Sequence, residues 1–327
     1  MLAVLVRRTV VLWVLASAVS YSLFAVFSKK VFDDGLRSTD LVVWRFAIAA
    51  PLAWSIVAVR HRRGGPGPRS APIRSMLILG VLFGFLALLA FAGLERIPAA
   101  LYTVVIYTYP AMVAVGAWIL GRPTPKALWG ALVLTMAGIS LTVPEAFSAG
   151  GAATTGLILT LLNAALYAVY VLVSGRLMSA PRRQGSAAGS FDGFVTTTWS
   201  LTGSLLVAVV LAAACGVHAP GSPEAWAGIV GLAVVSTVIA GAALMIGLGS
   251  IPAPTAAVIA TVEPVLTLVW AVTLLDETLQ PVQLAGAALV LAGVTWAQRI
   301  GSVGTPFDES SPDPATVSVD VVGTPGG

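Results

Sequence analysis

The chain has 327 residues, of which 57% are hydrophobic and only 10% are charged, and its formal net charge is +4. Soluble domains carry roughly 25% charged residues, so this composition excludes a soluble enzyme, a nucleic-acid-binding protein and a disordered chain. It indicates a membrane protein with several spans. The single cysteine, Cys215, excludes a disulfide framework and a cysteine-rich zinc site.

Apolar stretches of about 20 residues, the length that a helix needs to cross the hydrocarbon core, recur along the chain. The first follows Arg7 and Arg8, as in a signal peptide, but its apolar run continues to Phe27 and we expect it to be retained. The predicted fold is an all-α membrane protein with ten transmembrane helices. These helices are expected at 9–28, 39–59, 73–94, 98–120, 127–143, 154–175, 193–214, 225–249, 252–274 and 281–299.

The basic residues predict how the chain is oriented in the membrane. Alternate loops hold thirteen Lys and Arg residues on one side and four on the other, while Arg45 lies within a span. The positive-inside rule therefore places both termini in the cytoplasm of a multi-pass cell-membrane protein, and an even number of spans also requires the termini to share a side. Residues 301–327 contain four acids and no Lys or Arg, and we expect a disordered cytoplasmic tail there.

The second half of the chain repeats short patterns of the first half. Ile97-Pro98-Ala99 recurs 154 positions later as Ile251-Pro252-Ala253, and Tyr109-Pro110 recurs at the same offset as Glu263-Pro264. Shared composition is the alternative explanation, but matching prolines and matching spacing argue against it. Five spans in each half would make the second copy cross the membrane in the opposite sense. Inverted repeats of this kind are typical of secondary transporters, whose substrate site lies near the midplane.

In these features the chain resembles the drug/metabolite transporter superfamily, and specifically its tandem EamA domains. The resemblance is carried by the Ile-Pro-Ala motifs, the two span prolines, Trp44-Arg45-Phe46, Leu275-Asp276-Glu277 and glycine-rich fifth spans. It implies two five-helix domains, residues 1–146 and 147–300, and transport by alternating access without an ATP-hydrolysing domain. One departure is Pro123, which stands at the position equivalent to Glu277. Any role of this Glu is therefore expected in one half only.

Glu263 is the clearest polar group inside a predicted span, and a buried carboxyl there requires an explanation. Pro264 follows it and releases the backbone carbonyl of Ala260. A carboxyl and a free carbonyl at midplane depth suit a substrate amine, a proton or a cation. We predict that Glu263 binds substrate and couples transport to protons, and that Pro110 and Pro264 act as hinges. The alternative is a structural carboxyl bonded to a neighbouring helix.

Two matching stripes run along the first and sixth spans, and each holds its members on one helix face. A lipid-facing stripe would not be polar, so both are predicted to face the interior. Aromatic walls with a few polar groups suit an amphipathic small molecule, although packing between helices is an equal alternative. The stripes are Ser17, Tyr21, Phe24 and Ser28 in the first span, and Asn163, Tyr167, Tyr170 and Ser174 in the sixth.

Three tyrosines lie in the fourth predicted span. Tyr102 and Tyr109 are seven residues apart and share a face, whereas Tyr107 is expected to point elsewhere. Tyr109 is the better candidate for the substrate site because it is the repeat counterpart of Glu263. The alternative for Tyr102 is anchoring near the membrane interface.

Arg45 lies about 9 Å inside its span, at 1.5 Å per residue. Its side chain could snorkel outward to water or pair with Glu263 or Asp40. The family resemblance implies a gating or anion-binding role, and Arg45 is therefore counted among the predicted substrate-binding residues. Elsewhere, Gly80 and Gly84 form a GxxxG motif that predicts close helix packing.

The function that these features favour is secondary active transport of small metabolites, such as amino acids or amphipathic compounds, with export as the expected direction. The predicted cavity is lined by the first, fourth, sixth and ninth spans, joined by the third and eighth through family analogy, and Trp199 and Trp270 lie deep enough to contribute. The alternatives are a membrane-embedded enzyme and a passive channel. Against an enzyme, His61 and His218 fall in loops and no zinc-binding HExxH motif is present. We expect no cofactor, no metal and no nucleic acid; the partners are the substrate and the lipid bilayer, with oligomeric state left open.

Overall fold

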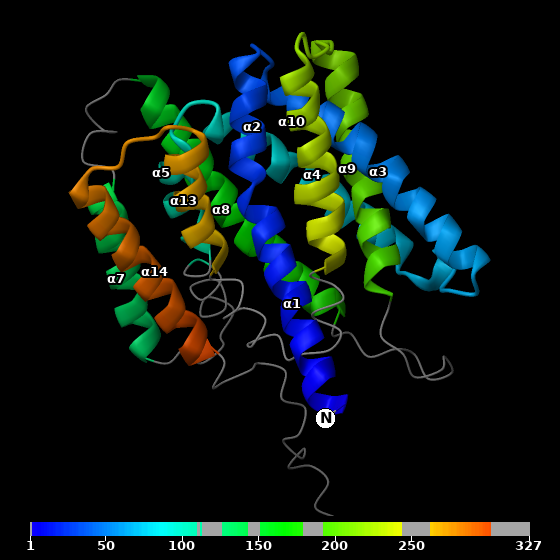
Figure 1. Cartoon of the computed structure of the whole chain (residues 1–327), viewed down its shortest axis with the longest axis horizontal. Coiled ribbons are helices and arrows are strands. Elements are labelled where there is room, and N and C mark those ends of the chain that lie inside the picture. Colours follow the sequence, from blue (N-terminus) through cyan, green and yellow to red (C-terminus); the bar gives the residue numbers. More distant parts are fainter. Residues whose placement is uncertain are drawn as a thin grey trace, which may run out of the picture.

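The computed structural model describes residues 2–109, 112, 126–142, 151–178, 192–243 and 262–301. Within these residues the chain is entirely helical, apart from turns and loops, which confirms the predicted all-α class (Figure 1). The elements are α1 (Leu2–Ser22), α2 (Phe24–Asp33), α3 (Ser38–Arg62), the short 3₁₀ turn η1 (Pro68–Ser70), α4 (Ile73–Leu94), α5 (Ala99–Ile106), α7 (Lys126–Thr142), α8 (Gly151–Met178), α9 (Gly193–Cys215), α10 (Pro223–Ala233), the π-helical segment η2 (Val234–Ile239), α13 (Val262–Leu274) and α14 (Pro281–Gly301).

Six helical stretches are long and apolar enough to cross a membrane, and each corresponds to a predicted span. They are Leu12–Asp33, Ser38–Arg62, Ile73–Leu94, Gly151–Tyr170, Gly193–Cys215 and Pro223–Ala243. The other four predicted spans contain α5, α7, α13 and α14, whose described apolar parts are shorter than 18 residues. The count of ten spans and the inverted repeat therefore stay predictions.

Several sequence predictions fall outside the described residues. They concern Pro110, Pro123, the Ile251-Pro252-Ala253 motif, Ala260 and the tail from residue 302. The side chain of Ser174 also lies outside them, although its backbone belongs to α8.

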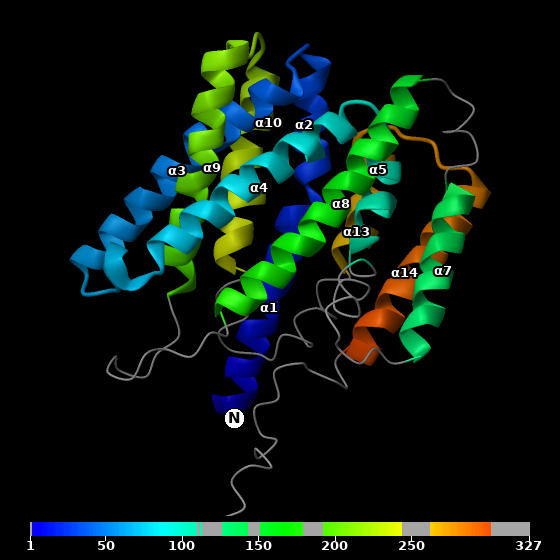
Figure 2. The same cartoon turned by 180° about the vertical axis from the view of Figure 1, so that it is seen from behind.

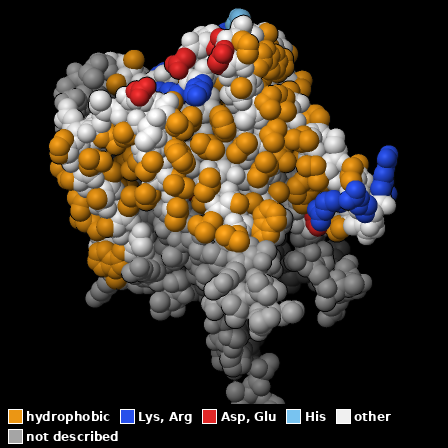
Figure 3. All heavy atoms as spheres, viewed as in Figure 1, with side chains coloured by type: hydrophobic (Ala, Val, Ile, Leu, Met, Phe, Trp, Pro, Cys, Tyr) orange, Lys and Arg blue, Asp and Glu red, His pale blue; other side chains and the backbone are white. Residues whose placement is uncertain are grey.

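The outer faces of the helices carry large apolar side chains. Leu12, Ile78, Val133 and Val210 have exposed fractions of 63% to 69%. Figure 3 shows apolar side chains across the middle of one face, with acidic side chains gathered near its upper rim and basic ones near the far end of α3. A contiguous apolar surface of this extent is unfavourable in water and suits a lipid environment.

The helices form two groups joined by α1, α2 and α8. On one side, α3, α4, α9 and α10 pack together; on the other, α5 packs against α13, and α7 lies alongside α14 (Figures 1 and 2). The α7–α14 contact is close because Gly138 faces the backbone of Gly286 and Val290. Figure 2 shows α4 and α8 crossing the back of the bundle, where α8 contacts both α4 and α5.

The predicted close packing at the GxxxG motif is confirmed. A Cβ atom on Gly80 would collide with the backbone oxygen of Ser200 in α9, and one on Gly84 would lie 2.8 Å from Val207 Cβ. The Ser204 hydroxyl donates a hydrogen bond to the Gly80 carbonyl at 2.8 Å. Small residues thus let the two backbones approach, and this contact fixes the rotation of α4 about its own axis.

The first span is interrupted at Leu23, which was not predicted. The interruption divides it into α1 and α2, and α2 continues to Asp33, five residues beyond the predicted end. Near the interruption, the Thr267 hydroxyl donates to the Ser22 carbonyl at 3.4 Å, and Trp270 Nε1 donates to the Ser22 hydroxyl at 2.9 Å. Side chains from α13 therefore bind polar groups where the first span changes course.

A second irregularity faces this interruption. The segment η2 of the eighth predicted span has π-helical hydrogen bonding. Its Ser236 hydroxyl donates to the Ser20 carbonyl at 2.7 Å, and the Ser17 hydroxyl donates to the Ala240 carbonyl at 2.9 Å. Two buried hydrogen bonds thus tie the last turns of α1 to η2 and to Ala240, the residue that follows it.

Candidate functional site

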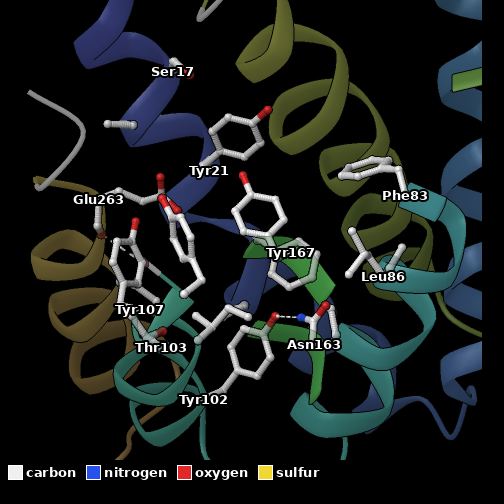
Figure 4. Close-up of a pocket in the computed structure, with 18 of the residues that line it drawn as sticks. Ser17, Tyr21, Phe83, Leu86, Tyr102, Thr103, Tyr107, Asn163, Tyr167 and Glu263 are labelled. Carbon is white, nitrogen blue, oxygen red and sulfur yellow. Dashed lines mark hydrogen bonds between the residues drawn. The ribbon is translucent and has the colours of Figure 1, made fainter. Parts of the chain in front are cut away.

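A cavity of about 290 Å³ lies among seven of the described helical elements and the turn that follows α5 (Figure 4). Its walls combine aromatic rings with a few polar side chains, which is the usual composition of a small-molecule site. The lining residues are Val14, Ser17, Ala18, Tyr21, Phe24, Ala25, Arg45, Phe83, Leu86, Ala87, Ala90, Tyr102, Thr103, Ile106, Tyr107, Tyr109, Asn163, Tyr167, Glu263 and Thr267.

The structure brings eight of the nine predicted substrate-binding residues to this cavity. They are Ser17, Tyr21, Phe24, Arg45, Tyr109, Asn163, Tyr167 and Glu263. The ninth, Tyr170, is not among the lining residues; its ring stacks on Tyr167, with centroids 6.0 Å apart, and also contacts Phe83. Tyr170 lies about one turn farther along α8, so it supports the wall rather than forming it.

The prediction that Tyr107 points away from the other tyrosines is wrong. The helix α5 ends at Ile106, and Tyr107 lies in the turn that follows. Helical periodicity therefore does not apply to its side chain, which lines the cavity and lies within hydrogen-bonding reach of the Glu263 carboxyl. The Tyr107 and Tyr109 rings are 6.0 Å apart.

Glu263 lies in the first turn of α13, directly before Pro264. Its carboxyl is within hydrogen-bonding reach of Tyr107 and lies near enough to several cavity tyrosines to interact with them electrostatically. These are Tyr21, Tyr102, Tyr107, Tyr109 and Tyr167. The described part of α13 begins at Val262, so the predicted hinge at Pro264 lies in its first turn, where a proline is readily accommodated.

Tyrosines form most of one cavity wall. The rings of Tyr109 and Tyr167 meet edge to face, with centroids 4.7 Å apart. Tyr102 is 6% exposed and its hydroxyl accepts a hydrogen bond from Asn163 Nδ2 at 3.4 Å. Tyr102 is therefore an interior residue, and the alternative of an interface anchor is wrong.

Arg45 is 5% exposed and points inward, so the snorkelling alternative is also wrong. Its Nε donates a hydrogen bond to the Thr237 hydroxyl at 2.9 Å. Its guanidinium carbon lies 5.3 to 5.8 Å from the ring centroids of four phenylalanines, an arrangement that favours a cation electrostatically. The rings belong to Phe24, Phe46, Phe83 and Phe91.

An ion pair between Arg45 and Asp40 was one alternative predicted from the sequence, and it is not formed. Asp40 is fully buried and accepts hydrogen bonds from the backbone nitrogens of Arg37 and His218, at 2.9 and 3.0 Å. The Arg37 side chain also bonds it. Asp40 thus fastens the loop after α9 to the start of α3. Among the ion pairs of the described residues, none joins Arg45 to Glu263.

Sequence reasoning did not place residues of α4 individually in the cavity. Phe83, Leu86, Ala87 and Ala90 form this wall. All four side chains are apolar, and an apolar residue in a membrane span can face either lipid or a cavity. The sequence therefore does not show which of the two they face. The GxxxG motif was the available signal, since it fixes which face of α4 meets α9 and thereby which face is left for the cavity. Of the two deep tryptophans, neither Trp199 nor Trp270 lines it.

A second cleft, lined by charged residues, lies between α2 and the loops that follow α4 and α13. Lys29 Nζ donates to the Ile97 carbonyl at 2.7 Å. The Glu277 carboxylate accepts hydrogen bonds from the backbone nitrogens of Ala99 and Ala100, at 2.6 and 3.0 Å. Glu277 therefore caps the amino end of α5, a helix that carries cavity residues.

The opposite end of α3 is joined to α9 by an ion pair. Arg60 holds both oxygens of Asp192, at 3.2 and 3.0 Å, and stacks over Phe194. Partial burial acts to raise the pKa of Asp192, but hydrogen bonds from Arg60 and from the Val195 amide outweigh it, so the pKa is lower than usual. Asp192 also caps α9 through the Val195 amide, at 2.9 Å.

Comparison with known proteins decides the family. The profile of the EamA-like transporter family matches residues 8–143 and again residues 154–297. The chain belongs to the EamA-like transporter family. Its membership makes it a multi-pass membrane protein of a transporter family and points away from an enzyme.

Individual relatives agree with this assignment. The uncharacterized transporter YcbK of Bacillus subtilis is 24% identical over 296 residues, which cover 87% of this chain and 91% of YcbK. The threonine/homoserine exporter RhtA of Escherichia coli is 26% identical over 220 residues, or 66% of this chain and 68% of RhtA. A solved crystal structure has the same fold, with a TM-score of 0.61 and 17% identity over 90% of this chain and 98% of its own.

In this EamA-family chain, both matched segments contribute to the cavity. The first segment supplies α1, α2, α3, α4 and α5, and the second supplies α8 and α13. Within the described residues, no three His, Cys, Asp or Glu side chains gather as a metal site would require. The cavity wall is therefore built from both segments that match the family.

Proposed function

We propose that the chain is a secondary active transporter that exports small metabolites, such as amino acids or amphipathic compounds, by alternating access. The observation that carries this proposal is the central cavity, whose aromatic and polar wall is drawn from both EamA segments. A site between two domains can be exposed to either side of the membrane when the domains move relative to each other. The exporter RhtA, named for threonine and homoserine, supports export and makes these two compounds the first substrates to test.

The remaining parts of the proposal concern arrangement. We infer two inverted five-helix repeats, residues 1–146 and 147–300, in the cell membrane with both termini cytoplasmic. Pro110 and Pro264 are the proposed hinges. The predicted tail, residues 301–327, is proposed to be dispensable for transport. Site-directed accessibility labelling of the two termini tests the orientation, and termini on opposite sides would contradict it.

Transport itself is tested by counterflow in proteoliposomes loaded with threonine or homoserine. A carrier exchanges internal unlabelled substrate for external labelled substrate, whereas a channel lets the label equilibrate without this stimulation. Accelerated uptake into loaded vesicles supports the proposal. Flux that is independent of internal substrate would indicate a channel, and chemical conversion of the substrate would indicate an enzyme.

Proton coupling is proposed to pass through Glu263, the cavity carboxyl within hydrogen-bonding reach of Tyr107. Glu263→Gln keeps the shape of the side chain but cannot release a proton, so we expect uptake to lose its dependence on pH. Glu224→Gln is a matched control because Glu224 is exposed in the first turn of α10. A pH profile that is the same in the parent and in Glu263→Gln would contradict proton coupling at this residue.

A further inference from the structure

The guanidinium of Arg45 is a buried cation that faces the cavity without an acidic partner. Among the described residues its one hydrogen bond is from Nε to Thr237, so its two terminal nitrogens have no protein acceptor there. The sequence contains few other acidic residues that could pair with Arg45. Of the 14 acidic residues, only Glu263 lies in the middle of a predicted span, and residues 110–125 and 244–261 contain no Asp or Glu.

The surroundings of Arg45 hold its charge in place without neutralising it. Four phenylalanine ring centroids lie 5.3 to 5.8 Å from the guanidinium carbon, and the Arg45 residue is only 5% exposed. In such a low-dielectric setting a cation attracts an anion more strongly than it would in water. A buried charge without a partner is unfavourable, and an anionic ligand would relieve that cost. The planar guanidinium is also suited to hold both oxygens of a carboxylate.

The side of the cavity away from Arg45 is acidic and aromatic. In Figure 4, Glu263 and Tyr107 lie on one side, whereas Phe83, one of the rings around Arg45, lies on the other. Tyr21 and Tyr102 lie between Glu263 and Phe83 in the view of Figure 4. A cationic group is stabilised by a carboxylate and by tyrosine faces, whereas a second carboxylate would be repelled there.

We propose that Arg45 binds the carboxylate of a small zwitterionic substrate, whose ammonium group points toward the tyrosines and Glu263. This proposal rests on the proposed transport function and narrows its substrate class to small zwitterionic carboxylates. It makes Arg45 the residue that selects acids over the corresponding amides and amines. Glu263 then excludes compounds that carry a second negative charge at that end.

The test compares ligands with and without the carboxylate. Isothermal titration of the purified full chain would use L-threonine, L-leucine and L-phenylalanine, each beside its α-amide. Charge-assisted hydrogen bonds at a buried site predict that an acid binds about 10- to 100-fold more tightly than its amide. In Arg45→Gln this ratio should fall to about one, while affinity for the amide is unchanged. A preference that survives in Arg45→Gln would overturn the proposal, as would failure of all three acids to bind.

Two further variants keep the result interpretable. Arg62→Gln is the matched control, because Arg62 is an exposed arginine at the end of the same helix, and the ratio should be retained. Should Arg45→Gln fail to fold, Arg45→Lys keeps the charge but loses the planar fork, and acid affinity should fall while amide affinity is kept. Equal loss of both affinities in Arg45→Lys would also overturn the proposal.

The transport proposal and the carboxylate proposal fail in different ways. Counterflow of tyramine, an aromatic amine without a carboxylate, at the same rate as the acids would leave transport intact and refute the role of Arg45. Counterflow that occurs with the acids but not with the corresponding amides supports both proposals. Absence of counterflow for every compound, with acids still bound, would refute transport and leave the carboxylate site standing.

Discussion

Removal of the Glu277 carboxylate is predicted to destabilise the protein by uncapping α5. This helix has eight residues, a length at which a helix is marginal unless it is held at its ends. Its first two amides, at Ala99 and Ala100, both donate to Glu277, and both residues are buried, at 0% and 3% exposure. Glu277 follows α13, so one side chain fixes a helix from the other family segment.

The magnitude follows from the two amides. A buried donor left without an acceptor costs about 1–3 kcal/mol, which gives about 2–6 kcal/mol for two donors in Glu277→Ala. Because Glu277 also lines a cleft that water can enter, we expect the lower part of that range, about 2–4 kcal/mol. Glu277→Gln keeps one acceptor oxygen but loses the charge, so its loss should be about half as large.

The free energy of unfolding can be measured by titrating SDS into detergent micelles and following helicity by circular dichroism. Glu224→Ala is the matched control: Glu224 also lies in the first turn of a helix, but Ser222 caps that helix by accepting from the Ala225 amide. The control should therefore lose less stability than Glu277→Ala. A loss in Glu277→Ala no larger than in Glu224→Ala would refute the capping argument.

Two further predictions concern packing and the ion pair at the end of α3. Gly80→Val should destabilise the protein by about 1–3 kcal/mol, because a Cβ there meets the Ser200 backbone; Gly151→Ala, which meets nothing within 4 Å, is the control, and an equal loss in both would contradict the close packing. The lowered pKa of Asp192 means that its bridge to Arg60 stabilises fully above the ordinary Asp pKa of about 3.9 and is lost as pH falls through the lower folded-state pKa. Asp192→Asn should flatten the fall in thermal stability below about pH 5, and an unchanged slope would exclude this contribution.

Helical periodicity predicted the cavity well wherever a helix is continuous. Asn163 and Tyr167 face the cavity from α8, as their four-residue spacing requires, and Ser17 and Tyr21 do so from α1. The same rule failed at Tyr107, because α5 ends one residue earlier. Periodicity holds only within an element, and the end of a short helix depends on tertiary contacts that a single sequence does not display.

The position of Arg45 in a span was evident from the sequence, but its direction was not. An arginine near a span end can reach outward to water or turn inward, and the choice depends on what surrounds it. Here Phe24, Phe83 and Phe91 come from two other helices, and Thr237 comes from the π-helical segment. None of these residues is marked as an arginine partner by its local sequence. The inward orientation is thus a product of helix packing.

The interruption at Leu23 could not be predicted, because the first span contains no proline or glycine near it. Helix irregularities of this kind persist where side chains satisfy the displaced backbone groups. Thr267 does this at the Ser22 carbonyl and Ser236 at the Ser20 carbonyl, while Trp270 donates to the Ser22 hydroxyl. All these contacts come from the second half of the chain. The interruption beside Tyr21 and Phe24 is therefore stabilised by contacts between the two segments that match the family. The proposed alternating access would have to change these contacts, so the segment around Leu23 is proposed as a hinge alongside the two proposed proline hinges.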